Sequence, residues 1–146
     1  MQITTKRIIE APVKKVFDCV AHIEQYRKAQ PHIIDVEFLT EQRVGTGTKF
    51  RETRMMHGKQ QLTELEVTQY VPGEKVRMVN VTNGTTWDTL WTFRQLENGT
   101  KMDFCMQANT QSRIAKFALM LLKPFISYAV TTDLDRLKQY CESEAE

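Results

Sequence analysis

The stretch Ile9-Glu10-Ala11-Pro12-Val13-Lys14-Lys15-Val16-Phe17-Asp18 marks the place where an opening β-strand gives way to a helix. Residues 2–10 alternate between two faces, which is typical of a half-exposed strand. Pro12 suits the first turn of a helix, where its missing N–H has no partner anyway, and apolar residues then recur at helical spacing. The stretch therefore predicts a strand followed by a short amphipathic helix over about 12–22.

The chain downstream of this helix is dominated by strand and turn signals. Residues 26–31 predict a second short helix or a loop, and residues 33–39 predict a strand. Five turn signals then follow before residue 109, so we expect six strands in this region. Asn-Gly and related pairs adopt positive φ cheaply, which makes these strands antiparallel neighbours in sequence order. The turns are Gly45-Thr46-Gly47, His57-Gly58-Lys59, Val71-Pro72-Gly73-Glu74, Asn83-Gly84 and Glu97-Asn98-Gly99.

Two of these strands indicate which face of the sheet is covered. Asp88 and Asp103 lie on the polar faces, so we expect these acids on a solvated surface. One apolar and one polar face are typical of a sheet that is covered on one side. The apolar faces carry Trp87, Thr89, Trp91 and Phe93 in residues 85–96, and Met102, Phe104, Met106 and Ala108 in residues 101–108.

Two other strands leave the inward face open. Whichever face of residues 48–57 points inward brings polar groups with it, and a buried charge without a partner is costly, so a polar ligand contact is most expected there. Its two faces carry Phe50, Glu52, Arg54 and Met56, or Lys49, Arg51, Thr53, Met55 and His57. In residues 76–82 the choice is between Met78 with Asn80 and Val79 with Val81.

The C-terminal part of the chain predicts one long helix from residue 113 to about residue 141. Ser112 can cap its N-terminus. Pro124 removes a backbone hydrogen bond in its middle, so we expect a kink near residues 120–124. The helical spacing places Ile114, Phe117, Leu121, Phe125 and Tyr128 on one side, followed by Val130, Leu134, Leu137 and Cys141.

These elements predict an α+β fold. A curved, seven-stranded antiparallel sheet, with two short helices after its first strand, wraps round a long C-terminal helix kinked near Pro124. The 146 residues have an average composition for a soluble globular protein, so we expect a single domain over 1–146. The space between sheet and helix is either filled by large side chains or kept open as a ligand cavity.

Composition disfavours several classes of protein. The formal net charge of +2 is too small for a nucleic-acid-binding surface. The N-terminus lacks the apolar stretch of a signal peptide, so we expect a cytoplasmic chain. The longest apolar run, residues 117–122, is far too short to span a bilayer. Cys19, Cys105 and Cys141 are scattered without a C-x-x-C pair, which favours free thiols over disulfides or a zinc site.

Four motifs, in this order, resemble the START-like superfamily, also called SRPBCC or helix-grip, and within it the polyketide cyclase/dehydrase-like group. Residues 9–18 are similar to its strand-to-helix opening, and residues 45–50 to its Gly-x-Gly turn. Residues 66–76 resemble its strand, Pro-Gly turn and strand, and residues 133–138 its closing helix. Residues 26–31 resemble in part a coenzyme Q-binding group, with Ala29 where that group has Phe.

The resemblance covers nearly the whole chain and implies the helix-grip fold. It also implies a pocket between the sheet and the long helix that takes an apolar small molecule, such as a lipid, polyketide, sterol or quinone. All four motifs have structural roles, so they imply no particular activity.

The candidate ligand-binding residues lie on the apolar faces that would line this cavity. They are Phe50, Met55, Leu65, Val67, Met78, Trp87, Trp91, Phe104, Met106, Phe117, Leu121, Phe125 and Tyr128. The candidate polar contacts are Arg54, His57 and Asn80. We expect no metal and no cofactor, because His22, His32 and His57 form no ligand-spaced pair and no phosphate-binding loop is present.

Three functions stay open. The leading hypothesis is binding or transport of a hydrophobic small molecule, since no convincing catalytic set is present. The second is a cyclase or dehydratase acting on a polyketide-like substrate, which needs polar groups converging in the pocket. The third is a protein-interaction module, including a coenzyme Q-binding-like accessory protein.

The partners expected from the sequence are a hydrophobic small molecule and no nucleic acid. We expect a monomer or homodimer without stable membrane insertion. Residues 119–126 are apolar on all sides of the helix, which suits a cavity lid, a dimer contact or a transient membrane contact.

Overall fold

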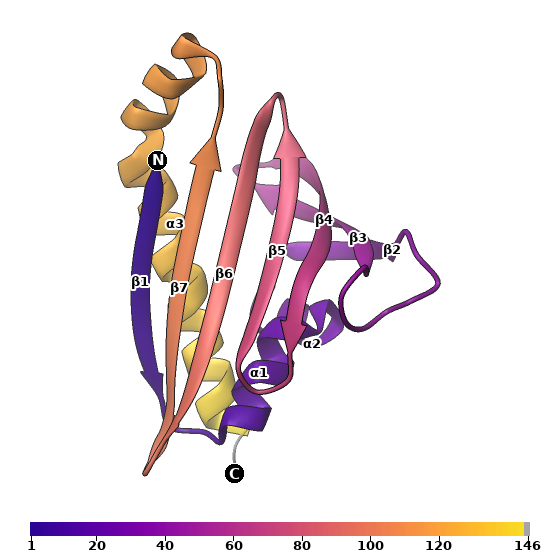
Figure 1. Cartoon of the computed structure of the whole chain (residues 1–146), viewed down its shortest axis with the longest axis vertical. Coiled ribbons are helices and arrows are strands. Elements are labelled where there is room, and N and C mark those ends of the chain that lie inside the picture. The colour runs from indigo at the N-terminus through magenta and orange to yellow at the C-terminus, as the bar shows by residue number, and fades with distance from the viewer. Residues whose placement is uncertain (145–146) are drawn as a thin grey trace.

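The computed structural model describes residues 1–144 and confirms the predicted α+β fold (Figure 1). An opening strand is followed by two short helices, six further strands and one long helix. The elements are β1 (Gln2–Ile9), α1 (Val13–Ala21), α2 (Ile23–Ala29), β2 (Ile33–Phe38), β3 (Lys49–Met56), β4 (Lys59–Val71), β5 (Lys75–Thr82), β6 (Thr85–Leu96), β7 (Gly99–Asn109) and α3 (Arg113–Glu144).

The seven strands form one antiparallel sheet in the order β1-β7-β6-β5-β4-β3-β2. Successive strands from β2 to β7 are neighbours, as the turn signals predict. The turns His57-Gly58 and Asn83-Gly84 have positive φ at both residues, which matches the twist of a two-residue hairpin. The first strand, β1, forms the edge of the sheet opposite to β2. It pairs with the last strand, β7, from Gln2 opposite Gln107 to Ile9 opposite Thr100.

The core lies between one face of this sheet and the helices. Figure 1 shows α1, α2 and α3 on the same side of the sheet. Phe17 of α1 is buried, and its ring lies 5.3 Å from the rings of both Tyr70 and Phe93 in edge-on contacts. Leu134 and Leu137 of α3 are also fully buried. The C-terminal half of α3 is therefore an integral part of the core.

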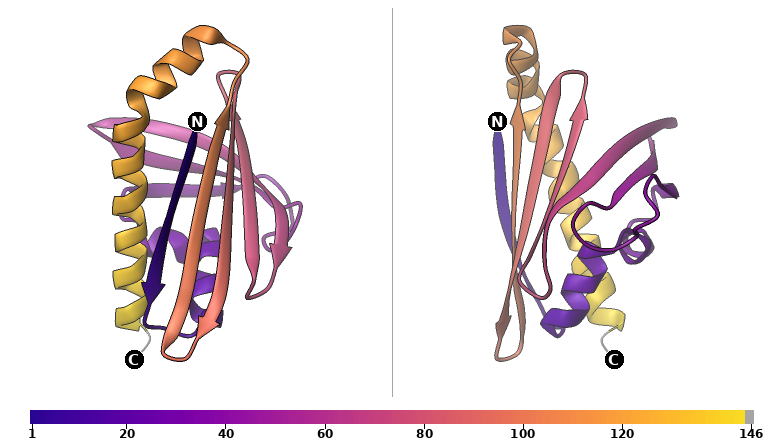
Figure 2. Two further views of the ribbon diagram at one scale, coloured as in Figure 1. Left: turned by 60° about the vertical axis from the view of Figure 1, so that its left-hand side comes forward. Right: turned by 45° about the vertical axis from the view of Figure 1, so that its right-hand side comes forward.

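The helix α3 is continuous and bent. The Ala115 N–H donates to the Ser112 Oγ at 3.2 Å, which confirms the predicted cap. Figure 2 shows the axis changing direction between the orange first turns and the yellow remainder, in the part of the helix that contains Pro124. This bend confirms the predicted kink. Its physical cause is that a proline in a helix interior crowds the preceding turn.

The prediction that the apolar stripe along the first half of α3 faces the cavity is wrong. Ile114, Phe117, Leu121, Phe125 and Tyr128 point to solvent, with 58% to 84% of each residue exposed. At about 100° per residue, these five side chains lie on the opposite side of the helix from Val130, Leu134 and Leu137. The helix carries two apolar stripes on opposite sides, and only the second one packs against the sheet.

The glycine at the β6–β7 turn should be irreplaceable. A Cβ on Gly99 would lie 2.4 Å from the Ile9 carbonyl oxygen, which is fixed by the pairing of β1 with β7. We expect Gly99→Ala to lower the free energy of unfolding by about 2 kcal/mol or more. Gly84→Ala is the matched control: it has positive φ but open space, so it should cost only about 1 kcal/mol. Urea denaturation of both variants measures this, and equal losses would contradict it.

Candidate functional site

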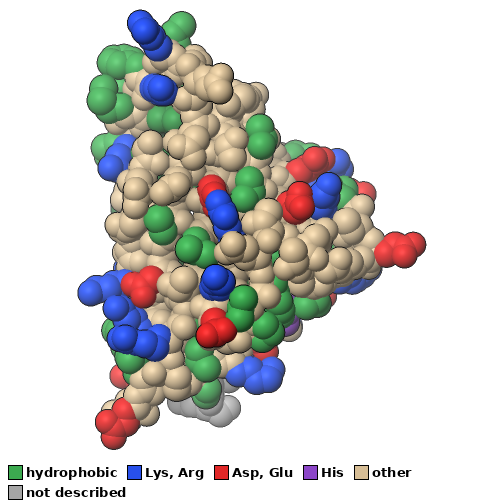
Figure 3. All heavy atoms as spheres, viewed as in Figure 1, with side chains coloured by type: hydrophobic (Ala, Val, Ile, Leu, Met, Phe, Trp, Pro, Cys, Tyr) green, Lys and Arg blue, Asp and Glu red, His purple; other side chains and the backbone are tan. Residues whose placement is uncertain are grey.

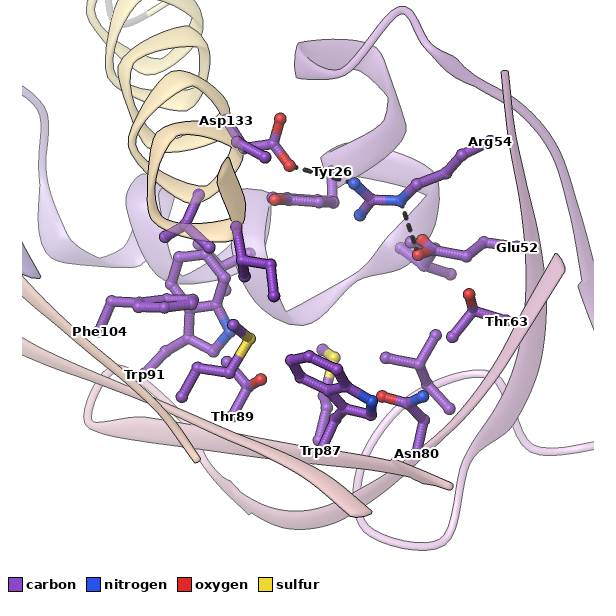
Figure 4. Close-up of a pocket in the computed structure, with 18 of the residues that line it drawn as sticks. Tyr26, Glu52, Arg54, Thr63, Asn80, Trp87, Thr89, Trp91, Phe104 and Asp133 are labelled. Carbon is purple, nitrogen blue, oxygen red and sulfur yellow. Dashed lines mark hydrogen bonds and ion pairs between the residues drawn. The ribbon is translucent and has the colours of Figure 1, made fainter. Parts of the chain in front are cut away.

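A pocket of about 410 Å³ lies between the inner face of the sheet and the helices, a size that suits a small-molecule ligand (Figure 4). Its floor comes from β3 to β7, and its cover from α1, α2 and α3. Most of the lining is apolar. The helices contribute Val20, Ile23, Tyr26, Ile126, Ala129, Val130, Asp133 and Leu134.

The structure places nine of the candidate residues in the lining of this pocket. The face of β3 that the sequence left open is the one with Phe50 and Arg54, and the inward face of β5 is the one with Met78 and Asn80. Whether these residues bind a ligand stays a prediction. The nine are Phe50, Arg54, Leu65, Met78, Asn80, Trp87, Trp91, Phe104 and Met106.

Seven other candidates lie outside the lining, for identifiable reasons. Met55 is on the outer face of β3, and His57 is exposed in a turn that needs its left-handed backbone. Val67 is buried in the core beside the pocket. The remaining four belong to the exposed stripe of α3. The part of α3 that does line the pocket is its opposite side, which includes Ile126, Val130 and Leu134. The four exposed candidates are Phe117, Leu121, Phe125 and Tyr128.

One wall of the pocket is aromatic. The rings of Trp91 and Phe104 meet edge-on at 4.8 Å, and the Tyr26 ring meets Trp91 edge-on at 6.1 Å. Trp87 is half-buried and lines the pocket from the same face of β6 as Trp91. Edge-on contacts hold such rings in defined orientations, so this wall offers flat apolar surfaces to a ligand.

The opposite end of the pocket is a cluster of charged side chains centred on Arg54 (Figure 4). Its Nε donates to the Glu52 Oε1 at 2.9 Å, and its Nη1 donates to the Asp133 Oδ2 at 3.1 Å. The same Nη1 lies 3.0 Å from the His32 Nε2. Glu52 is two residues away on the same face of β3, whereas Asp133 comes from α3. The cluster therefore joins the sheet to the long helix.

Mutual contacts fix the charge states in this cluster. Burial by itself would lower the pKa of Arg54, but the carboxylates of Glu52 and Asp133 outweigh it and hold the pKa above its usual range. Burial raises the pKa of Tyr26, and Asp133 raises it further, so its hydroxyl stays protonated. Burial also lowers the pKa of His32; Asp133 opposes this, while the nearby arginines reinforce it.

Tyr26 and Asp133 are site residues that the sequence analysis missed. A signal for Asp133 existed: it lies among Val130, Leu134 and Leu137 on the buried side of α3, where an acid is unusual. No such signal marks Tyr26, because α2 is only seven residues long.

The acids expected on the outer face of the sheet lie outside the pocket. The Arg77 Nε donates to the Asp88 Oδ1 at 2.7 Å, and this hydrogen bond lowers the pKa of Asp88. The Asp103 side chain is half exposed. Within residues 1–144, no group of three or more His, Cys, Asp or Glu side chains is placed to hold a metal ion.

The sequence matches the family described as polyketide cyclase/dehydrase and lipid transport over residues 1–142. The chain belongs to this family, and its fold is that of the START-like superfamily. No curated protein matches the sequence.

Solved structures share the fold at low sequence identity. Ara h 8.0201 superposes with a TM-score of 0.77 at 12% identity, covering 98% of both chains. The protein TTHA0849 from Thermus thermophilus gives 0.76 at 17% identity, covering 100% of both. The di-domain ARO/CYC StfQ from the steffimycin biosynthetic pathway gives 0.79 at 15% identity over 99% of this chain and 51% of that one.

Breaking the Arg54 cluster should destabilise the protein. Arg54→Met leaves the buried Glu52 carboxylate without its cation and leaves Asp133 with only its longer contacts to Arg136 and His32, which should cost about 3 kcal/mol of unfolding free energy. Arg51→Met is the matched control, since Arg51 pairs with Glu37 and Glu64 on the exposed side of the same strand, and its loss should lower the free energy of unfolding far less. Denaturant unfolding compares the two, and a similar cost for both would contradict the role of the cluster.

Proposed function

We propose that the protein binds an uncharged, largely apolar small molecule that carries a polar oxygen group. The aromatic wall would hold the apolar body, and the Arg54 end would face the oxygen. The proposal rests on one observation: a largely apolar pocket whose charged groups, Glu52, Arg54 and Asp133, all lie at a single end. Such a division orients a ligand, because a ligand bound the other way round would bury its oxygen against apolar side chains without a hydrogen-bond partner, which costs free energy.

The preference for an uncharged ligand follows from the balance of charges at the polar end. Arg54 and Arg136 carry two positive charges, and Glu52 and Asp133 carry two negative ones, with distances of 2.9 to 3.6 Å within the pairs. Every charge already has a partner, so a ligand carboxylate would find no free cation and would pay its full desolvation cost. A hydroxyl or carbonyl oxygen can instead use neutral groups at this end, including the protonated Tyr26 hydroxyl and the Thr63 side chain.

The two tryptophans of the chain provide the test, because both line the pocket. Menadione, a neutral bicyclic diketone, should quench their fluorescence saturably, whereas 2-naphthoate, an anion of similar shape, should bind at least about tenfold more weakly. Thr89→Phe fills the pocket and should abolish the quenching. The matched control Thr92→Phe lies on the outer face of the same strand and should retain it. Equal affinity for both ligands, or quenching that survives Thr89→Phe, would overturn the proposal.

A cyclase-type activity is the second candidate, favoured by the convergence of Glu52, Asp133 and Tyr26 at one end of the pocket. Aldol cyclisation of a poly-β-ketone needs a base for an α-proton and a donor for the carbonyl oxygen that becomes a hydroxyl, before water leaves. A carboxylate and the protonated Tyr26 hydroxyl could fill these roles.

Product analysis separates the two candidates. For a cyclase, mass spectrometry of a linear poly-β-ketone thioester incubated with the protein should show loss of one water. Glu52→Gln or Asp133→Asn should slow this by about 100-fold or more while menadione still quenches the tryptophans. The control Glu64→Gln, on the outer face, should keep full activity. If the protein gives no turnover above the uncatalysed rate, the cyclase candidate is excluded and ligand binding without catalysis is the function that stands.

A further inference from the structure

The first half of α3 is unusually bare. Over residues 113–128, which we call the bare half, Leu119 is the only buried residue. Ile114, Phe125 and Tyr128 are 84%, 73% and 74% exposed. Figure 3 shows hydrophobic side chains gathered at this end of the molecule, with Lys and Arg side chains beside them. An exposed apolar surface of this extent on a protein usually marks an interaction site.

The bare half is apolar over more than half of its circumference. At about 100° per residue, the exposed apolar side chains form a continuous arc. Lys116 and Lys123 fall on the remaining side, whereas Arg113, in the first turn, falls at the edge of the arc between Met120 and Phe117. The arc consists of Met120, Phe117, Tyr128, Leu121, Ile114, Phe125 and Leu122.

The charges near this arc are all positive. Residues 104–132 contain three cations, Arg113, Lys116 and Lys123, and no Asp or Glu. A wide apolar arc with cations at its edge and on the other side is the pattern of a helix that lies in the interface of a membrane, where the cations stay at the level of the headgroups.

We propose that the bare half of α3 docks the protein on the surface of a membrane that contains anionic lipids. A helix over residues 113–143 has the length and apolar composition to cross a bilayer. However, the bare half extends only about 24 Å at 1.5 Å per residue, less than the roughly 30 Å of a hydrocarbon core. The rest of α3 is committed to the protein core through Leu134 and Leu137. The bare half can therefore enter the interface but not span the membrane.

Charge favours a lipid surface over a second copy of this chain. Two bare halves packed against each other would bring six cations together without any acid from either segment. Anionic headgroups supply the missing negative charge and attract each Lys or Arg near the surface.

Docking in this way would place the pocket next to the membrane. Ile126 and Ala129 line the pocket, whereas their neighbours Phe125 and Tyr128 belong to the exposed arc. An apolar molecule could then pass between bilayer and pocket with a short path through water. This last step rests on the proposed binding function, but the docking itself does not.

Sedimentation with vesicles tests the docking. The wild-type protein should bind phosphatidylcholine vesicles that contain 30% phosphatidylserine, roughly tenfold more strongly than vesicles of phosphatidylcholine alone. Leu121→Glu combined with Phe125→Glu should abolish binding to both. Val44→Glu, which changes a half-exposed apolar residue in the β2–β3 loop, should bind as the wild type does. Circular dichroism checks that each variant is folded.

Several results would overturn the proposal. These are no binding of the wild type to either vesicle, binding that survives Leu121→Glu with Phe125→Glu, or a dimer in solution that this variant dissociates without any vesicle binding. Menadione should still quench the tryptophan fluorescence of the Leu121→Glu with Phe125→Glu variant, because neither residue lines the pocket. The docking and the ligand binding are therefore tested separately. Quenching without vesicle binding in the wild type would refute the docking alone, and vesicle binding without quenching would refute the ligand proposal alone.

Discussion

The guanidinium of Arg54 is held between a carboxylate of its own strand and a carboxylate of the C-terminal helix, and this arrangement keeps part of the protein interior polar. Three ionised groups cannot be covered by apolar side chains without losing partners, so sheet and helix cannot close completely at this end. The same ion pairs fix the distance between β3 and α3. The pocket can be understood as the space that remains when a curved sheet is tied to a helix through charges rather than through packed methyl groups.

Much of the fold could be predicted from the sequence because its signals are local. Alternation and turn pairs such as Asn83-Gly84 depend on residues a few positions apart, and these predictions agree with the structure. The stripe on α3 failed for a different reason. A helix of 32 residues can carry two apolar faces, and its periodicity does not say which one meets the sheet. The exposed stripe extends past Pro124, where the axis bends, and ends at Tyr128.

The site was harder to predict than the fold, because its parts come from distant segments. Tyr26, Glu52, Arg54 and Asp133 meet only after two helices and the sheet are in place. The inward face of β3 could not be chosen in advance, since both faces mix polar and apolar residues. Once the partners of Arg54 are known, the choice has a physical reason: Glu52 can be buried because its countercharge is two residues away on the same face.

The bend in α3 at Pro124 divides one continuous helix into two mechanical units. Proline supplies no N–H for the hydrogen bond that would continue the helical ladder across this point, so opening the first turns need not disturb those that follow. The first unit has few tertiary contacts, and its backbone amides should exchange with solvent far faster than those around Leu134 and Leu137. The protein thus carries a segment whose local stability is set by what it touches outside the domain, joined to one whose stability equals that of the whole fold.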